Sequence, residues 1–310
     1  MAAKIKIGTR GSALALFQAR LFADLLQRAD AAVEAEIVEI KTSGDWKPSQ
    51  GEQRLSEAQG GKGQFAREIE HALTSGVIDC GVHSMKDMPS FLPDGLVIDH
   101  ILPREDPRDA FLCNQGGVLD DLPHGAVVGT ASMRRQSFLL ARRPDLKIVP
   151  FRGNVPTRIA KLRDGQVDAT LLAVAGLKRL DLLHESAAIL SPEIMLPAAG
   201  QGAIGIEIRA GDTHLHGLLD EVHCRESGLC VFAERAALQI LDGSCHTPIG
   251  AYATIAGDVL SLRVAVGALD GQPVFSDSEE SAVRSRAEAE ALGAALGERL
   301  KARLPAGFLE

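Results

Sequence analysis

Aromatic residues and long apolar runs are both scarce in this chain of 310 residues. Phe, Trp and Tyr make up only 4% of the sequence, so few side chains could stack on nucleic-acid bases. No apolar run approaches the roughly 20 residues that cross a bilayer, and the amino-terminal segment lacks an apolar core of signal-peptide length. We therefore expect a cytoplasmic protein that binds neither nucleic acid nor membrane.

The five cysteines form no disulfide framework. Their number is odd, their spacing is irregular and no Cys-x-x-Cys pair occurs. Cys224, Cys230 and Cys245 lie near His223 and His246, but this spacing matches no common zinc motif. We expect reduced thiols and no metal.

The formal net charge is −8, yet basic residues concentrate in one segment. Residues 130–163 hold nine basic residues and one acid, Asp145. Solvated helix faces account for about half of these residues. Arg152 is different, because it follows an apolar strand predicted at residues 147–151, and ligands bind at strand ends in open α/β sheets.

Short apolar strands alternate with amphipathic helices through the first two-thirds of the chain. Strands are predicted at residues 5–8, 33–42, 77–82, 147–151 and 169–174, and helices at 64–75 and directly after Ser12. The helix after Ser12 carries an apolar stripe of Leu14, Phe17, Leu21 and Leu25. This alternation predicts parallel sheets with right-handed crossovers.

The strand–turn–helix pattern appears twice. The segment at residues 7–12 resembles the one at 128–135, and the segment at 76–79 resembles the one at 165–168. We interpret this order as two similar α/β domains facing a cleft, although short segments of this kind also resemble one another by chance. Each domain would direct a helix N-terminus lined by Thr or Ser at the cleft, where backbone N–H groups bind carboxylates or phosphates.

The remaining segments complete the predicted organisation. Residues 44–63 have no periodicity and indicate a mobile loop over the cleft, in which the 60–63 segment GGKG lacks the Ser or Thr of a nucleotide-binding loop. Residues 106–108 and 196–202 resemble crossings between domains. A helix at 225–241, strands at 249–255, 259–266 and 274–278, and a helix at 282–304 indicate a small α+β domain. The predicted domains are 1–103 with 200–220, 104–199, and 221–310.

Two clusters carry candidate chemistry. Cys245 lies on a turn bounded by Gly243 and Pro248, an exposed position that strengthens the case for a reactive thiol, with an ordinary thiol as the alternative. Lys86 and Asp87 follow a predicted strand, where the pair can handle an anion and a proton, although a surface ion pair in a turn fits equally well. The neighbouring His83 is interpreted as a packed or hydrogen-bonded residue rather than a base.

The chain resembles the hydroxymethylbilane synthase family, also called porphobilinogen deaminase. The shared segments occur in the family's order and span essentially the whole chain, with a looser match after Pro248. They are TRGS at 9–12, GGKG at 60–63, HSMKD at 83–87, REDPRDAF at 104–111, GTASMRR at 129–135, RGN at 152–154, LAVAGLKR at 172–179, GQG at 200–202 and GSC at 243–245.

The resemblance implies a monomeric transferase of tetrapyrrole and haem biosynthesis. Such an enzyme deaminates four porphobilinogen molecules, joins them head to tail on a covalently bound dipyrromethane primer, and releases hydroxymethylbilane by hydrolysis. The implied fold is two α/β domains similar to periplasmic binding proteins, plus a small C-terminal α+β domain. A non-catalytic solute-binding or effector-sensing module for a small carboxylate is the alternative, but it would need neither Cys245 nor Asp87.

The resemblance also implies roles for particular residues. Cys245 would hold dipyrromethane through a thioether, and Asp87 would be the catalytic carboxylate beside the pyrrole nitrogens. The implied cofactor-binding set is Cys245, Ser84, Lys86, Asp87, Thr130, Ser132, Arg134, Arg135, Arg152 and Gly153. The implied substrate-binding set is Arg10, Ser12, Lys62, Arg158, Arg179 and Gln201. The loop lacks a further lysine that some relatives have before GGKG, which leaves its contacts other than Lys62 open, and Ser244 stands where relatives commonly have Gly.

The cofactor assignment predicts an added mass on Cys245. Intact mass and peptide mapping of the purified protein should locate a dipyrromethane there, and Cys245→Ser should give folded, inactive protein because a hydroxyl is a poorer nucleophile than a thiolate. An active enzyme with an unmodified Cys245 would contradict the assignment.

Overall fold

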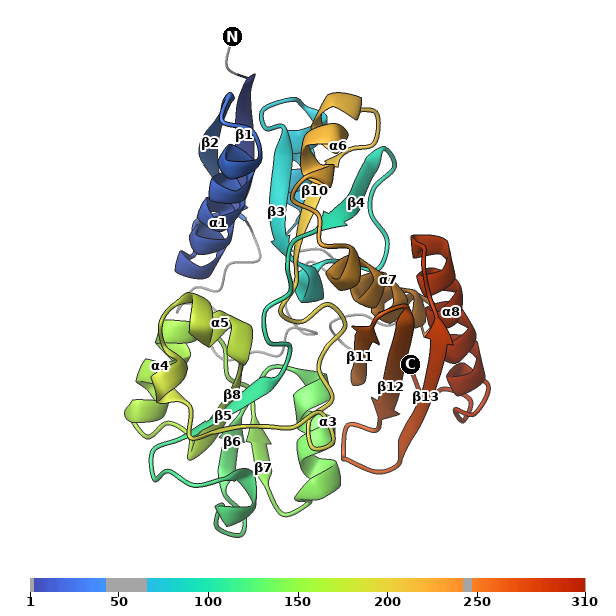
Figure 1. Ribbon diagram of the computed structural model, residues 1–310. Coiled ribbons are helices and arrows are strands. Elements are labelled where there is room, and N and C mark those ends of the chain that lie inside the picture. The colour runs from blue at the N-terminus through green and yellow to red at the C-terminus, as the bar shows by residue number, and fades with distance from the viewer. Residues whose placement is uncertain (1–2, 43–65, 242–246, 310) are drawn as a thin grey trace.

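A computed structural model describes residues 3–42, 66–241 and 247–309. Two five-stranded sheets lie one above the other in Figure 1, and a three-stranded sheet lies beside them. The expected fold class, two α/β units and a small α+β unit, is confirmed. The loop expected at 44–63 and the Cys245 turn lie outside the described residues.

The first sheet has the strand order β2-β1-β3-β10-β4. Strand β1 pairs in parallel with β2 and β3, whereas β10 pairs antiparallel with β3 and β4. Its strands are β1 (Ala3–Arg10), β2 (Val33–Ile40), β3 (Cys80–Ser84), β4 (Leu96–Ile101) and β10 (Ile204–Arg209). The helices of this unit are α1 (Ala13–Ala29), α2 (Arg67–Thr74) and α6 (Thr213–Asp220), with the 3-10 turn η2 (Met85–Asp87).

The second sheet repeats this topology in the order β7-β6-β8-β5-β9. Strand β6 pairs in parallel with β7 and β8, and β5 pairs antiparallel with β8 and β9. Its strands are β5 (Asp109–Cys113), β6 (Val127–Gly129), β7 (Lys147–Val149), β8 (Ala169–Ala173) and β9 (Ala188–Ile189). Its helices are α3 (Met133–Arg142), α4 (Val155–Arg163) and α5 (Val174–Arg179), with 3-10 turns η3 (Leu119–Asp121) and η4 (Leu183–Glu185). The repeat predicted from short segments is therefore confirmed.

The prediction of wholly parallel sheets was wrong. Each sheet contains an antiparallel strand next to one edge strand, β10 in the first and β5 in the second. Each of these strands continues a segment that crosses from the other unit. A strand that returns from the other unit enters its sheet from the opposite direction. Local alternation of strands and helices cannot show this, because the direction depends on where the preceding segment ends.

The third unit packs two helices on an antiparallel sheet. It consists of α7 (Arg225–Ile240), β11 (Ile249–Ala256), β12 (Val259–Gly267), β13 (Val274–Ala282) and α8 (Arg286–Lys301). The apolar side chains of this unit belong to one core that also includes Met85 and Met88 of the first unit. Helix α8 approaches α7 closely, because a Cβ on Gly293 would lie 2.1 Å from the Ala233 carbonyl oxygen.

Three local expectations need correction. Helix α1 begins after its Ser12 cap as predicted, but it buries Ala19, Phe22 and Leu26 rather than the predicted stripe, and Phe17 of that stripe is exposed. This helix is apolar on several sides, so periodicity alone could not choose the buried face. Strand β3 begins at Cys80 rather than at residue 77, and α8 spans fewer residues than the predicted 282–304.

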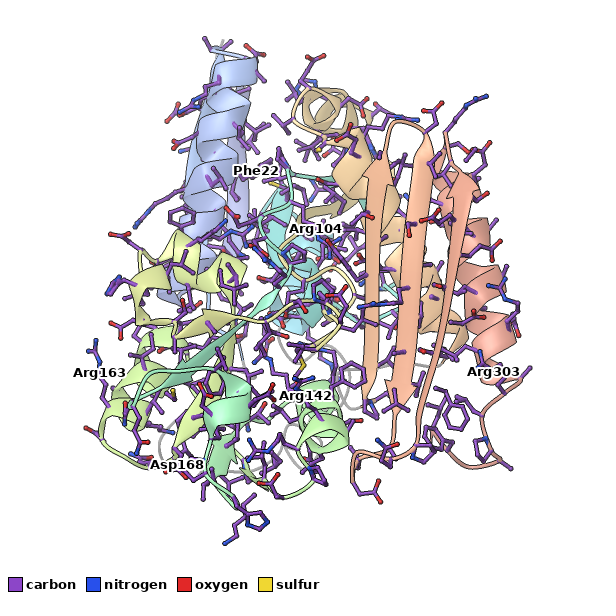
Figure 2. The ribbon with its side chains drawn as sticks, turned by 60° about the horizontal axis from the view of Figure 1, so that its bottom comes forward. Phe22, Arg104, Arg142, Arg163, Asp168 and Arg303 are labelled. Carbon is purple, nitrogen blue, oxygen red and sulfur yellow. The ribbon has the colours of Figure 1, made fainter. Side chains whose placement is uncertain are left out.

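A buried ion pair joins the segments that link the three units. Arg104 lies between β4 and β5 and donates from Nη1 and Nη2 to Glu234 of α7, at 2.7 and 3.1 Å. Glu234 is fully buried and also accepts from the backbone N–H groups of Gly200 and Ala253, both at 2.7 Å. Arg104 is labelled near the centre of Figure 2. One carboxylate therefore connects both crossing segments with α7 and β11.

Glu234→Gln should lower the free energy of unfolding by about 3–5 kcal/mol, because it leaves Arg104 as a buried cation without its counter-ion. Urea unfolding measures the loss. Glu279→Gln is the matched control, since Glu279 pairs with Arg299 on the surface at 2.5 Å and should change stability by no more than about 1 kcal/mol. Equal losses in the two variants would refute a central role for Glu234.

Candidate active site

The carboxylate of Asp87 lies on a turn that the surrounding backbone holds firmly. The η2 turn follows β3 directly, and its Met85 N–H donates to the Ala203 carbonyl at 3.1 Å. Met85 is buried, and a Cβ on Gly205 would lie 2.1 Å from its sulfur. Gly200, at φ +69°, would place a Cβ 2.7 Å from the Met85 Cβ. Only glycine fits these close approaches, so the chain after the second crossing presses the turn into place.

A small pocket of about 60 Å³, open to solvent, brings four predicted residues together. Arg10 at the end of β1, the α1 cap Ser12, Ser84 and Asp87 all line it, with Gln18 between them. The buried Gln18 donates from Nε2 to Ser84 Oγ at 2.8 Å. Substrate-binding and catalytic candidates from separate elements thus share one cavity.

The α3 N-terminus carries the paired arginines. Ser132 caps this helix by accepting from the Arg135 N–H at 3.4 Å, and Thr130 Oγ1 accepts from the Ser132 N–H at 3.1 Å. Arg134 and Arg135 are both buried, and both bond the same carboxylate, Asp109 at the start of β5, at 2.7 and 2.6 Å. Burial alone would raise the pKa of Asp109, but the two guanidinium groups outweigh it and hold that pKa well below its usual range.

A polar bridge connects Lys86 with these arginines. Gln201 is buried and donates from Nε2 to Asp109 Oδ1 at 3.1 Å and to the Pro107 carbonyl at 2.6 Å. Its Oε1 accepts from Lys86 Nζ at 3.4 Å. Burial lowers the pKa of Lys86 to about 8, and the charges of Asp87, Arg135 and Asp109 act on it as well. Lys86 of the first unit therefore belongs to the same electrostatic cluster as the arginines of the second.

The remaining predicted residues lie on three nearby segments. Arg152 is buried after β7, and Gly153 has φ +122°, a conformation that favours glycine. Arg158 of α4 donates to the Gly153 carbonyl at 2.8 Å, which holds this turn. Arg179 of α5 donates to the Gly202 carbonyl at 2.7 Å, and burial lowers its pKa to about 10.

Lys62 and Cys245 lie outside the described residues, so the thioether site and the loop contact stay predictions. The role of His83 as a hydrogen-bonded residue is confirmed, since its Nε2 lies 2.8 Å from the buried Glu207 Oε2. Within residues 3–42, 66–241 and 247–309, no group of three His, Cys, Asp or Glu side chains could hold a metal ion. No helix in those ranges is long and apolar enough to span a membrane.

The site suits a ligand with several carboxylates. Lys86, Arg134 and Arg135 bring three cations together, and arginine bonds carboxylates through a planar fork. Among the described residues, Arg134 Nε is buried without an acceptor, so this cluster retains an unsatisfied donor. Cations and a spare hydrogen-bond donor are the groups that a carboxylate-bearing cofactor requires.

Other basic residues of the 130–163 segment are engaged on the surface. Arg142 and Arg163, both labelled in Figure 2, pair with Asp120 and Glu185, and Arg143 pairs with Asp145. These residues therefore match the expectation of basic side chains on solvated surfaces. Arg134, Arg135 and Arg152 differ from them because they are buried.

Sequence reasoning missed Asp109 and Gln18. Asp109 lies within the family segment at 104–111, but nothing in the local pattern shows that its partners come 25 residues later. Gln18 lies on α1, next to Phe17 of the stripe that was predicted to be buried. The pattern therefore did not indicate that Gln18 faces β3.

Comparison with known proteins identifies the family. Residues 5–217 match the profile described as porphobilinogen deaminase, dipyrromethane cofactor-binding domain, and residues 228–302 match the porphobilinogen deaminase C-terminal domain. The chain belongs to the porphobilinogen deaminase family. As a member of this family it is a transferase with a dipyrromethane cofactor, which does not favour the non-catalytic alternative.

Two relatives within the porphobilinogen deaminase family are similar over nearly their whole length. The porphobilinogen deaminase of Paracoccus denitrificans is 51% identical over 99% of this chain and 96% of its own. That of Nitrobacter hamburgensis is 47% identical over 96% and 92%.

Solved structures give only distant likenesses. The VFT2 domain of BvgS from Bordetella pertussis has a TM-score of 0.43 at 18% identity, over 71% of this chain and 85% of that domain. A Salmonella typhimurium periplasmic binding protein specific for arginine has a TM-score of 0.41 at 14% identity, over 71% and 93%.

The lowered pKa of Lys86 predicts a pH-dependent stability in cofactor-free Cys245→Ser protein. From about pH 8 to 10.5 the unfolded chain binds more protons at this residue than the folded chain, so the free energy of unfolding should rise with pH in that window. Lys86→Met should remove this rise and stabilise the protein at pH 7 by up to about 3 kcal/mol.

Urea unfolding at several pH values measures this effect. Lys147→Met is the control, because Lys147 is exposed on β7 and its replacement should leave the pH dependence unchanged. A Lys86→Met profile that runs parallel to that of the Cys245→Ser parent would contradict the lowered pKa.

Proposed function

We propose that this chain is a hydroxymethylbilane synthase that joins four porphobilinogen molecules on a dipyrromethane held by Cys245 and then releases the linear tetrapyrrole by hydrolysis. The observation that carries the proposal is the pocket in which Asp87 lies with Arg10, Ser12 and Ser84, next to the cationic cluster of Lys86. A carboxylate for the chemistry and cations for substrate arms are thus side by side.

The two sides of the site have different roles in this proposal. Lys86, Thr130, Ser132, Arg134, Arg135, Arg152 and Gly153 hold the cofactor's carboxylate arms, with Ser84 at the boundary of the pocket. Arg10 and Ser12 bind the incoming porphobilinogen, while Arg158 and Arg179 contact the growing chain. Gln201 acts from within the polar bridge, because it is only 1% exposed and bonds Lys86 and Asp109.

Asp87 acts as the acid when the C–N bond of the substrate's aminomethyl group is cleaved. It gives a proton to the departing amine, the C–N bonding electrons stay with nitrogen, and ammonia leaves. The aminomethyl carbon of the substrate becomes part of a cationic azafulvene, and the carboxylate of Asp87 remains as its counter-ion. Dipyrromethane, when bound, supplies the pyrrole α-carbon that forms the new C–C bond and then loses its proton. After four additions, water would cleave the bond between the primer and the first added ring. Its hydroxyl would go to the methylene carbon of that ring, and a proton would return to the primer's α-carbon.

The fixed position of Asp87 also reduces the entropic part of the activation barrier for C–N cleavage. The η2 turn is held by Met85 and by the glycines of the second crossing, so Asp87 is oriented before substrate arrives. Orientation of this kind converts an encounter between molecules into a step within one complex.

The cellular setting belongs to the same proposal. We infer a monomer in the cytoplasm that binds porphobilinogen and neither nucleic acid nor membrane, with domains at 1–103 plus 200–220, 104–199 and 221–310. The net charge of −8 and the engaged surface arginines support this view.

Asp87→Asn should separate binding from chemistry. Asparagine keeps the size of the side chain but can neither deliver the proton nor balance the azafulvene cation, so ammonia release should fall by about a hundredfold to ten-thousandfold. The measurement is single-turnover ammonia release from porphobilinogen, with cofactor occupancy determined by intact mass on the same sample.

Asp94→Asn is the control, because Asp94 is an exposed residue of the same unit and should leave the rate unchanged. A loaded Asp87→Asn enzyme that releases ammonia within about tenfold of wild type would make Asp87 a structural residue of the turn.

A further inference from the structure

Asp109 lies at the centre of the cationic cluster formed by Lys86, Arg134 and Arg135. Its side chain is fully buried, and its two oxygens accept four hydrogen bonds. Oδ2 accepts from Arg134 Nη2 at 2.7 Å, whereas Oδ1 accepts from Arg135 Nη2 at 2.6 Å, Arg135 Nε at 3.2 Å and Gln201 Nε2 at 3.1 Å. One carboxylate therefore orients both guanidinium groups and the bridging amide.

Each guanidinium group has a second, independent acceptor. Arg134 donates from Nη1 to the Leu196 carbonyl at 2.7 Å, and Arg135 donates from Nη1 to the Leu171 carbonyl at 2.8 Å. Two acceptors on different sides leave little freedom to a planar group. The arginines are thus already arranged without any ligand, and Arg134 Nε is still without an acceptor among the described residues.

Asp109 also reduces the repulsion among the three cations of the cluster. Lys86, Arg134 and Arg135 act on one another electrostatically, and burial disfavours the charged forms of Lys86 and Arg134. Asp109 and Asp87 are the acids that act on Lys86 in this cluster. Without Asp109 the buried cations would repel one another until carboxylates of a ligand arrived.

We propose that Asp109 is a positioning residue that holds Arg134 and Arg135 ready for the cofactor's carboxylate arms while the cofactor is absent. The proposal rests on the proposed function, because it requires a carboxylate-bearing cofactor at this site. Once the arms are bound, their charge supplements that of Asp109. Loss of Asp109 should therefore harm the unloaded protein more than the loaded protein.

The test compares Asp109→Asn in two backgrounds, one with Cys245 and one with Cys245→Ser, which cannot retain the cofactor. Thermal unfolding gives the loss of Tm in each background, and intact mass gives the occupancy. We expect the loss of Tm to be greater in the Cys245→Ser background by at least about 3 °C. Folded Asp109→Asn protein that has Cys245 but remains unloaded also supports the proposal.

Asp145→Asn is the matched control. Asp145 bonds Arg143 at 2.8 Å within the same unit but away from the cluster, so its loss of Tm should be equal in the two backgrounds and its occupancy normal. Equal losses for Asp109→Asn in the two backgrounds, together with normal occupancy, would overturn the proposal and leave Asp109 as an ordinary structural ion pair.

The proposal can also be tested if Asp109→Asn does not fold. If Asp109→Asn is not recovered in either background, the double variant Asp109→Asn with Arg135→Gln removes one anion and one cation together. Recovery of folded double variant supports the counter-ion role, and its failure to fold overturns it. A wild-type protein without added mass on Cys245 would instead refute the proposed function, so the two failures are distinguishable.

Discussion

A buried cation is stable only beside an anion, and this constraint shapes the centre of the molecule. In the proposed function this centre also keeps positive charge for a ligand's carboxylates, although it lies where two sheets and a third unit meet. Two fully buried acids resolve the conflict. Asp109 neutralises the paired arginines of α3, and Glu234 neutralises Arg104 while it accepts two backbone N–H groups. Recognition and assembly of the fold therefore depend on the same kind of interaction.

The repeated topology explains why these groups come together. Both sheets place parallel strands beside one interior antiparallel strand, and the segments that lead into β5 and β10 cross between the units. Asp109 begins β5, and Gln201 lies just before β10, so the two crossings meet at the polar bridge. The same crossing brings Gly200 against Met85 and orients the turn that carries Asp87. Topology thus converts distant sequence segments into one site.

Lys86 illustrates the conflict between stability and function. Burial lowers its pKa to about 8, which means that keeping this ammonium group charged in the folded protein without cofactor costs free energy. A ligand carboxylate would reverse the balance, because opposite charge favours the ammonium form. Strain of this kind is typical of binding sites, where groups are arranged for the complex rather than for the free protein.

The sequence by itself determined the local features of this protein, because these depend on neighbouring residues. The Ser12 cap, the strand before Lys86 and Asp87, the repeated strand–turn–helix order and the family segments were all readable from the chain. Only the tertiary structure decided which face of α1 is buried and that β5 and β10 each run antiparallel to their neighbours in the sheet. It also decided that Asp109 bonds Arg134, Arg135 and Gln201. These features depend on contacts between residues far apart in the chain, and neither periodicity nor spacing records such contacts.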